Sequence, residues 1–192
     1  ISNIPFGDVA VFDPEFSGSK DTARRSAAKT VHNYFFLKSL DTVREGGIVA
    51  FITSQGVLDA PSNAPIREYM MRHARLPNNL FTENANTEVG SDLILLQKNS
   101  NKNGELYYNE KLFLQTEKTP IGTSVNAYAN SISLPSNTDI IKGTDPYGKP
   151  AYKYIHRGDT TQLAEDLREH LKIELQQLDK GLYEKYSLHP VP

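Results

Sequence analysis

The chain contains no cysteine among its 192 residues, and its net charge is only −2. Without cysteine it can form neither a disulfide nor a thiolate-ligated metal site, which favours a reducing compartment and predicts a cytoplasmic protein. A charge this close to zero does not by itself predict binding to nucleic acid, so a DNA-handling role would need a local basic patch or help from another domain. The five histidines lack the spacing of metal ligands, and we predict no metal site.

Long apolar runs are also missing from the sequence. No run approaches the roughly 18 residues of a membrane span, so we predict no membrane partner. The first residues lack the pattern of a signal peptide. Because the chain begins with Ile1 instead of methionine, we interpret it as a piece of a longer polypeptide.

The first seven residues, Ile-Ser-Asn-Ile-Pro-Phe-Gly, hold the most informative pattern of the chain. The exocyclic nitrogen of adenine is a poor nucleophile because its lone pair is delocalised into the ring, and acceptors on its two hydrogens would make it more reactive. The side-chain oxygen of Asn3 and the backbone carbonyl of Ile4 can be these acceptors, while Pro5 stiffens the turn. Phe6 can stack on a base that has left the duplex, which offsets roughly 1–3 kcal/mol of the cost of flipping. The pattern predicts methyl transfer to adenine N6, although the same residues suit an ordinary strand-to-loop turn.

The segment that follows predicts an α/β unit. A helix capped by Asp21 or Thr22 is expected to run to about Arg44, and a Gly-Gly turn ends it. Residues 48–52 form a continuous apolar run, typical of a strand that is buried on both faces of a mainly parallel sheet. The Thr-Ser-Gln-Gly sequence at 53–56 then lies at the carboxyl end of this strand, where ligands bind in open α/β sheets.

Periodicity and turn residues predict several further elements downstream. In order, these are a helix at 66–73, a strand at 92–97, a strand at 105–115, a loop at 116–150, a short strand at 151–155 and a helix that starts at Asp159 or Thr160. The final helix has a leucine stripe from Leu163 to Leu182, spaced by three or four residues. This apolar face needs a partner, which can be this domain or a neighbouring one.

The order of the motif, the helix, the glycine turn and the buried strand resembles N6-adenine DNA methyltransferases whose catalytic motif lies in mid-domain. The resemblance is closest to the methylase region of the large helicase–methylase proteins of Bacteroides-type mobile elements, and it covers residues 1 to about 98. The segments that carry it are 2–7, 32–38 (His-Asn-Tyr-Phe-Phe-Leu-Lys), 41–47 (Asp-Thr-Val-Arg-Glu-Gly-Gly), 51–56, 76–81 (Leu-Pro-Asn-Asn-Leu-Phe) and 87–92 (Thr-Glu-Val-Gly-Ser-Asp).

The resemblance implies a role for each residue that matches the family's pattern. Asn3 and the carbonyl of Ile4 would hold the target amine, with Pro5 shaping the turn and Phe6 stacking on the base. Phe81 matches a second aromatic that sandwiches the flipped base in this class. A core phenylalanine beside a strand explains Phe81 equally well.

A basic cluster lies beside the motif loop in the sequence. Its members are Lys20, Arg24 and Arg25, with Lys29 close by. We assign the first three to substrate binding, because such a cluster can meet DNA phosphates. A solvated helix start explains the same residues.

Two departures from the family stand out. The cofactor-binding half, with its glycine-rich loop and its acidic residue, is missing, and the Gly46-Gly47 turn precedes a strand instead of following one. We therefore expect residues outside this chain to bind most of S-adenosylmethionine, and we assign no cofactor-binding residue here. In addition, residues 72–74 run directly into 75–77, where the family has a short strand. Either this strand has been lost or residues are missing at that point, and we predict the second.

The sequence thus predicts an α/β fold, namely a partial Rossmann-like methyltransferase sheet with flanking helices and a C-terminal helical tail. Residues 1–100 would be the C-terminal half of an adenine methyltransferase catalytic domain, and residues 101–192 an accessory segment. The fragment would be inactive alone, with DNA, the missing N-terminal methylase half and a helicase domain of the same polypeptide as partners. Lacking its first strands, it would expose a sheet edge. The alternative is a non-catalytic DNA-binding or interaction module of a helicase-like protein, which Ile4 at the family's first proline position favours.

Overall fold

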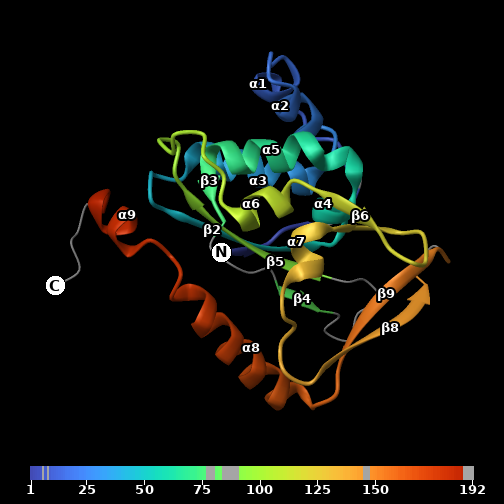
Figure 1. Cartoon of the computed structure of the whole chain (residues 1–192). Coiled ribbons are helices and arrows are strands. Elements are labelled where there is room, and N and C mark those ends of the chain that lie inside the picture. Colours follow the sequence, from blue (N-terminus) through green and yellow to red (C-terminus); the bar gives the residue numbers. More distant parts are fainter. Residues whose placement is uncertain (6, 8, 77–80, 84–90, 145–147, 188–192) are drawn as a thin grey trace.

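The computed structural model describes residues 1–5, 7, 9–76, 81–83, 91–144 and 148–187, the side chains of 81–83 and 174 excepted. Helices and strands are mixed along the chain, which forms one five-stranded sheet and two separate hairpins (Figure 1). Within these ranges, none of the helices combines the length and the apolar composition that a bilayer span requires. The predicted mixed α/β class is therefore confirmed at this level.

One strand of the sheet runs against the other four. The strands are β1 (Ser2–Asn3), β2 (Ile48–Ser54), β3 (Ala74–Arg75), β4 (Phe81–Glu83) and β5 (Ser91–Lys98). Their order is β1-β2-β5-β3, with β4 also paired to β5. β1 is parallel to β2, whereas β2, β3 and β4 are each antiparallel to β5. The prediction of a mainly parallel sheet is therefore wrong for the described strands, because the insertion of β5 leaves β1–β2 as their one parallel pair. β1 lies at an edge of the described sheet.

The burial of β2 differs from the prediction. Val49, Ala50 and Phe51 are buried, whereas Ile52 is 40% exposed. Successive residues of a strand point to opposite faces, and Ile52 belongs to the face that Phe51 does not. Two-sided burial therefore ends before the carboxyl end of this strand.

The short strand for which the sequence left no obvious room is present as β3. Ala74 and Arg75 pair with Lys98 and Gln97 of β5. The expectation of missing residues at this point is therefore unnecessary, because a two-residue strand begins as soon as the preceding helix ends at His73.

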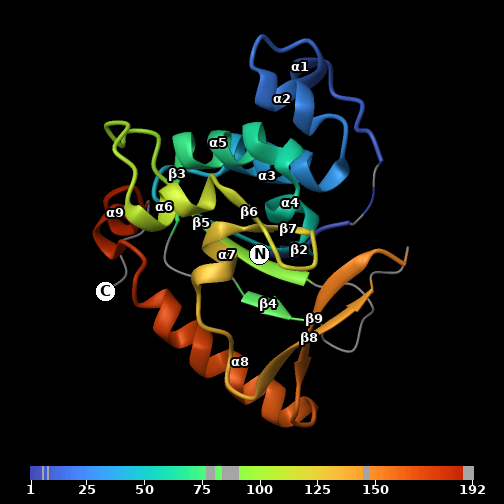
Figure 2. The same cartoon turned by 45° about the vertical axis from the view of Figure 1, so that its right-hand side comes forward.

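Helices cover one face of the sheet (Figures 1 and 2). They are α2 (Thr22–Ala27), α3 (Val31–Thr42) and α5 (Ala64–His73), with the short α1 (Pro14–Ser17), α4 (Gly56–Asp59) and 3-10 helix η1 (Pro61–Asn63). The main core lies between these helices and the sheet, where the ring of Phe36 meets that of Phe51 edge-on at 5.1 Å. The predicted helix at 66–73 is confirmed as α5.

The single helix predicted from residue 21 to 44 is two helices. Asp21 caps α2 as expected, since its carboxylate accepts a hydrogen bond from the N–H of Ala23 at 2.8 Å. The chain then turns after Ala27, and α3 starts at Val31. The break lets α2 pack across α3 and α5, with the small side chains of Ala23 and Ala27 buried at the contact.

The second half of the chain is more regular than predicted. It contains α6 (Tyr108–Phe113), the hairpin of β6 (Thr116–Lys118) and β7 (Ser124–Asn126), α7 (Ala127–Ser131), the hairpin of β8 (Thr138–Thr144) and β9 (Pro150–His156), α8 (Thr160–Leu175) and α9 (Lys180–Lys185). The strand predicted at 105–115 is wrong, because Glu110 accepts the N–H of Tyr107 at 2.9 Å and so caps a helix. The loop predicted at 116–150 is wrong too, because most of it forms the two hairpins and α7.

The final helix begins as predicted, with Asp159 accepting the N–H groups of Thr161 and Gln162 at 2.9 Å. It ends at Leu175, so the leucine stripe divides between α8 and α9. Residues after 101 also enter the main core, where Phe113 and Tyr128 are buried and their rings lie 6.4 Å apart.

Candidate functional site

The motif lies where β1 ends beside β2. Asn3 pairs with Ile52, and the N–H of Ile4 donates to the carbonyl of Ile52 at 3.2 Å. Ile4 is 3% exposed and belongs to the core, whereas Asn3 and Pro5 are exposed. The side chain of Ile4 thus anchors the end of the strand, and Asn3 belongs to the opposite sheet face. Phe6 falls outside the described residues.

Phe81 and Asn3 lie in the same row across the sheet. Phe81 is paired with Leu93, Leu93 with Ile52, and Ile52 with Asn3. Three strand spacings of about 4.8 Å put their backbones about 14 Å apart on one face. The side chain of Phe81 is outside the described part, so its stacking role stays a prediction.

Two hydrogen bonds from asparagine side chains hold the turn that follows β2. The amide of Asn33, on α3, donates to the side-chain oxygen of Asn63 at 2.9 Å, and Asn63 donates to the carbonyl of Gly56 at 2.9 Å. Asn33 is 2% exposed. The Ser-Gln-Gly sequence is therefore held from α3, at the carboxyl end of β2 and beside the end of β1.

A buried polar cluster lies at the carboxyl end of β2, on the helix side of the sheet. Thr53 and Asp92 pair across β2 and β5 and are 0% and 1% exposed. The Thr53 hydroxyl has no hydrogen-bond partner among the described residues. Asp59, at the end of α4, accepts the N–H of Asn126 at 2.8 Å. Burial raises the pKa of Asp59 to about 6, against the opposing effects of this hydrogen bond and of the Arg67 charge.

Arg67 is the buried cation of this cluster. It is 1% exposed and donates to the carbonyls of Leu58 and Ala60 at 2.8 and 2.9 Å. Its burial lowers the pKa of the guanidinium, and Asp59 is the first of the charges that oppose the shift. The pair positions the chain after β2. Sequence reasoning missed both residues, because an arginine on an amphipathic helix carries no sign of its burial.

A tyrosine of the β8–β9 hairpin reaches the same cluster. Burial, together with the negative charges of Asp59 and Asp92, raises the pKa of Tyr154 to about 12. β9 also contacts β4, which carries Phe81. The hairpin therefore lies beside β4, across the sheet from Asn3. The sequence predicted only a loop and a short strand for this segment.

The predicted basic cluster lies apart from the motif. Arg24 is paired with Asp41 at 2.7 Å and lies over the ring of Phe16 at 5.1 Å. Arg25 donates to the carbonyl of Ser19 at 2.5 Å, and Lys20 is exposed. Both views show α1 and α2 on the far side of the helical layer from β1 (Figures 1 and 2). Their assignment to DNA binding stays a prediction, and the contacts of both arginines support the fold.

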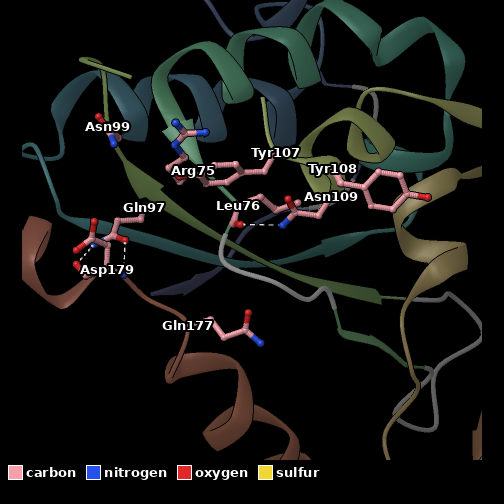
Figure 3. A pocket seen from close by; sticks show the side chains of 9 residues that line it. All are labelled: Arg75, Leu76, Gln97, Asn99, Tyr107, Tyr108, Asn109, Gln177 and Asp179. Atoms are coloured by element: carbon pink, nitrogen blue, oxygen red, sulfur yellow. Dashed lines mark hydrogen bonds between the residues drawn. The ribbon is translucent and has the colours of Figure 1, made fainter. Parts of the chain in front are cut away.

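A second cleft lies at the other end of the sheet (Figure 3). It has a volume of about 640 Å³ and is lined by β3, β5, α6 and the segment between α8 and α9. Its two charged residues are engaged within the fold, since Arg75 binds Glu110 at 2.8 Å and Asp179 accepts the N–H of Leu182 at 2.8 Å. Gln97, in its wall, pairs with the first residue of β2, far from Asn3. The cleft is therefore no part of the motif site.

The Gly46-Gly47 turn offers no space for a cofactor. Gly46 has a φ of +72°, and the backbone of Leu182 in α9 fills the space over it. The glycine turn is thus occupied by the chain's own C-terminal helix. Among the described residues no group of three histidine, aspartate or glutamate side chains could hold a metal ion.

No family model matches the chain, and no curated protein or solved structure matches it significantly. The assignment of a function therefore depends on the residues and on the geometry described above.

Proposed function

We propose that this chain is the base-binding half of a DNA methyltransferase that acts on adenine N6. In this proposal the sheet is the C-terminal part of a Rossmann-like sheet, and the missing N-terminal half would pair with the free edge of β1. That half would hold S-adenosylmethionine and supply the methyl group. The first support is the parallel pair β1–β2, which α2 and α3 connect as in a βαβ unit.

The observation that carries the proposal is that Asn3 and Ile4, which are adjacent at the end of β1, belong to opposite faces of the sheet. Ile4 is buried and bonded to β2, so its backbone is held in place, while the Asn3 amide is exposed on the opposite face. Two oxygen acceptors therefore come from adjacent residues of one rigid strand end. Acceptors fixed where positive charge develops on the attacking nitrogen stabilise the transition state without reorganisation.

The test is methyl transfer from S-adenosylmethionine to DNA by the longer polypeptide that includes this chain. Asn3→Ala should abolish transfer and leave DNA binding intact. Asn103→Ala, an exposed asparagine in the turn before α6, is the matched control and should transfer normally. A wild-type polypeptide that binds the cofactor and transfers nothing contradicts the proposal, as does robust transfer by the 192-residue chain alone.

The second candidate is a non-catalytic DNA-binding or interaction module. The observation in its favour is Ile4, which occupies the motif position as an ordinary core residue. A non-catalytic module would bind DNA without transferring methyl groups even as wild type, and Asn3→Ala would leave that binding unchanged. The same experiment therefore separates the two candidates.

A further inference from the structure

A groove of about 310 Å³ lies between the two hairpins. Tyr152, Tyr154 and Ile140 of the β8–β9 hairpin form one wall, and the β6–β7 segment with Lys118 forms the other. In Figures 1 and 2 the two hairpins lie next to each other near the carboxyl end of β2. Its volume is at the lower end of the range for small-ligand sites, roughly 300–1,000 Å³.

The β8–β9 hairpin places a lysine beside two tyrosines on one face. Lys142 is directly opposite Tyr152, so both belong to the face that carries Tyr154. Lys142 is exposed, and neither Lys142 nor Lys118 is in an ion pair with another described residue. Residues 138–157 contain four basic and two acidic residues, in a chain of net charge −2. The hairpin therefore favours an anionic ligand with a flat ring.

The other wall adds a single carboxylate. Glu117 accepts a hydrogen bond from Asn130 at 3.4 Å. The remaining lining of that wall is uncharged apart from Lys118. The lining of the groove thus combines Lys118, Glu117 and two tyrosine rings. Lys142 is outside this lining but lies opposite Tyr152 on the same face of the hairpin, where it adds a second exposed cation.

The groove lies near β4, at the end of the sheet where β2 ends and across the sheet from β1. Tyr154, in its wall, lies within electrostatic reach of Asp59 and Asp92, and β9 contacts β4. β4 in turn places Phe81 in the same row as Asn3. A DNA strand with its target base at Asn3 would have to cross the roughly 14 Å from β1 to β4 to reach the hairpins, so the groove is placed for a nucleotide farther along that strand.

We propose that this groove binds an unpaired nucleotide of the strand that carries the target adenine, with Tyr152 stacking on its base and Lys118 and the neighbouring Lys142 on its phosphates. This inference rests on the proposed function, since the flipped adenine fixes where the strand enters. Stacking on an aromatic ring together with a basic track is the usual way that proteins bind single strands. A single nucleotide, and not an intact duplex, matches the size of the groove.

The experiment uses the absence of tryptophan from the chain. In a Tyr152→Trp variant, a 12-nucleotide single-stranded DNA should quench the fluorescence of the one tryptophan as a base stacks on it. Tyr108→Trp is the matched control, since Tyr108 is 78% exposed and lines the other cleft. It should show no quenching.

Two further variants test the contacts by fluorescence anisotropy at fixed salt. Tyr152→Ala should weaken binding of the labelled strand about fivefold or more, as expected for one lost stacking partner. Lys142→Ala should weaken binding and lower the slope of log affinity against log salt by about one. Lys111→Ala, an exposed lysine of α6, should change neither.

The inference is overturned if the strand does not bind, if it quenches both tryptophan variants equally, or if the duplex binds better and Tyr152→Ala has no effect. These outcomes leave Asn3-dependent methyl transfer by the longer polypeptide untouched. Conversely, quenching confined to Tyr152→Trp without any methyl transfer supports the groove and contradicts the catalytic role. The two proposals can therefore fail separately.

Discussion

Gln97 and Asp179 exchange two hydrogen bonds although 82 residues separate them in the sequence. The side-chain amide of Gln97 donates to the carbonyl of Asp179 at 2.9 Å and accepts from its N–H at 3.0 Å (Figure 3). Gln97 is 2% exposed, so the pair seals the junction between β5 and the start of α9. Arg44 adds a hydrogen bond to the carbonyl of Tyr183 at 3.1 Å. The end of the helical tail is therefore docked on this sheet, while the stripe of α8 remains half-buried.

Docking of α9 depends on the absence of a side chain at Gly46. We expect Gly46→Ala to displace α9, because its Cβ would overlap the backbone of Leu182. Gly104→Ala is the control, since Gly104 has the same φ of +72° with no atom within 4 Å of its Cβ. Both variants should lose roughly 1–3 kcal/mol through backbone strain. Only Gly46→Ala should lose hydrogen-exchange protection in α9, and equal protection in the two variants would contradict the contact.

Glu110 is the acceptor of a buried charge network between α6 and β3. It is 0% exposed and pairs with Arg75 at 2.8 Å and with Lys102 at 3.4 Å. Glu110→Gln would leave two cations without their partner, and we expect a loss of about 3–5 kcal/mol in unfolding free energy. Urea denaturation measures it, with the exposed Glu105→Gln as control, which should stay within about 0.5 kcal/mol of wild type. A loss below 1 kcal/mol for Glu110→Gln would rule out a structural role for the network.

The sequence predicted elements wherever local signals agreed with tertiary packing. The apolar run at 48–52, the Asp21 cap and the Asp159 cap each carry such a signal, and each is found in the structure. The strand predicted at 105–115 was wrong because Glu110 is buried in a helix by its contact with Arg75, which is 35 residues away in the sequence. The prediction of a mainly parallel sheet was wrong at β5, because an apolar run carries no sign of the direction in which its strand will pair. For the site, the sequence could locate Asn3, but no local signal distinguishes a buried Arg67 from an exposed one.

Asp59 should make stability depend on pH. Its pKa is raised by burial to about 6 in the folded protein, against an ordinary value of 3.8. Between these values the folded state binds more protons than the unfolded state, so stability falls as the pH rises from about 4 to 6. A difference of about two units corresponds to roughly 3 kcal/mol.

The measurement compares wild type with Asp59→Asn by urea denaturation at several pH values. Relative to Asp59→Asn, wild type should lose roughly 2–3 kcal/mol of unfolding free energy as the pH rises from 4 to 6.5. The difference between the two proteins should stay constant at higher pH. The subtraction removes the opposite contribution of carboxylates whose pKa is lowered, such as Asp13 and Asp21. A difference that does not change with pH would show that Asp59 ionises normally.

Asn3 and Ile4 should separate function from stability, although they are neighbours in the motif. Asn3 is exposed at the end of an edge strand, so Asn3→Ala should stay within about 0.5 kcal/mol of wild type in urea. Ile4 is 3% exposed in the main core, and Ile4→Ala should cost about 2–4 kcal/mol. Ile4→Val keeps most of the buried volume and leaves the backbone carbonyl in place, so it should fold and, in the longer polypeptide, transfer methyl groups normally.

If Ile4→Val folds but transfers nothing, the side chain of Ile4 has a role in catalysis that its burial does not explain. If Asn3→Ala unfolds the protein, loss of transfer in that variant is no longer a sign of lost chemistry, and Asn3→Asp becomes the variant that tests the amide.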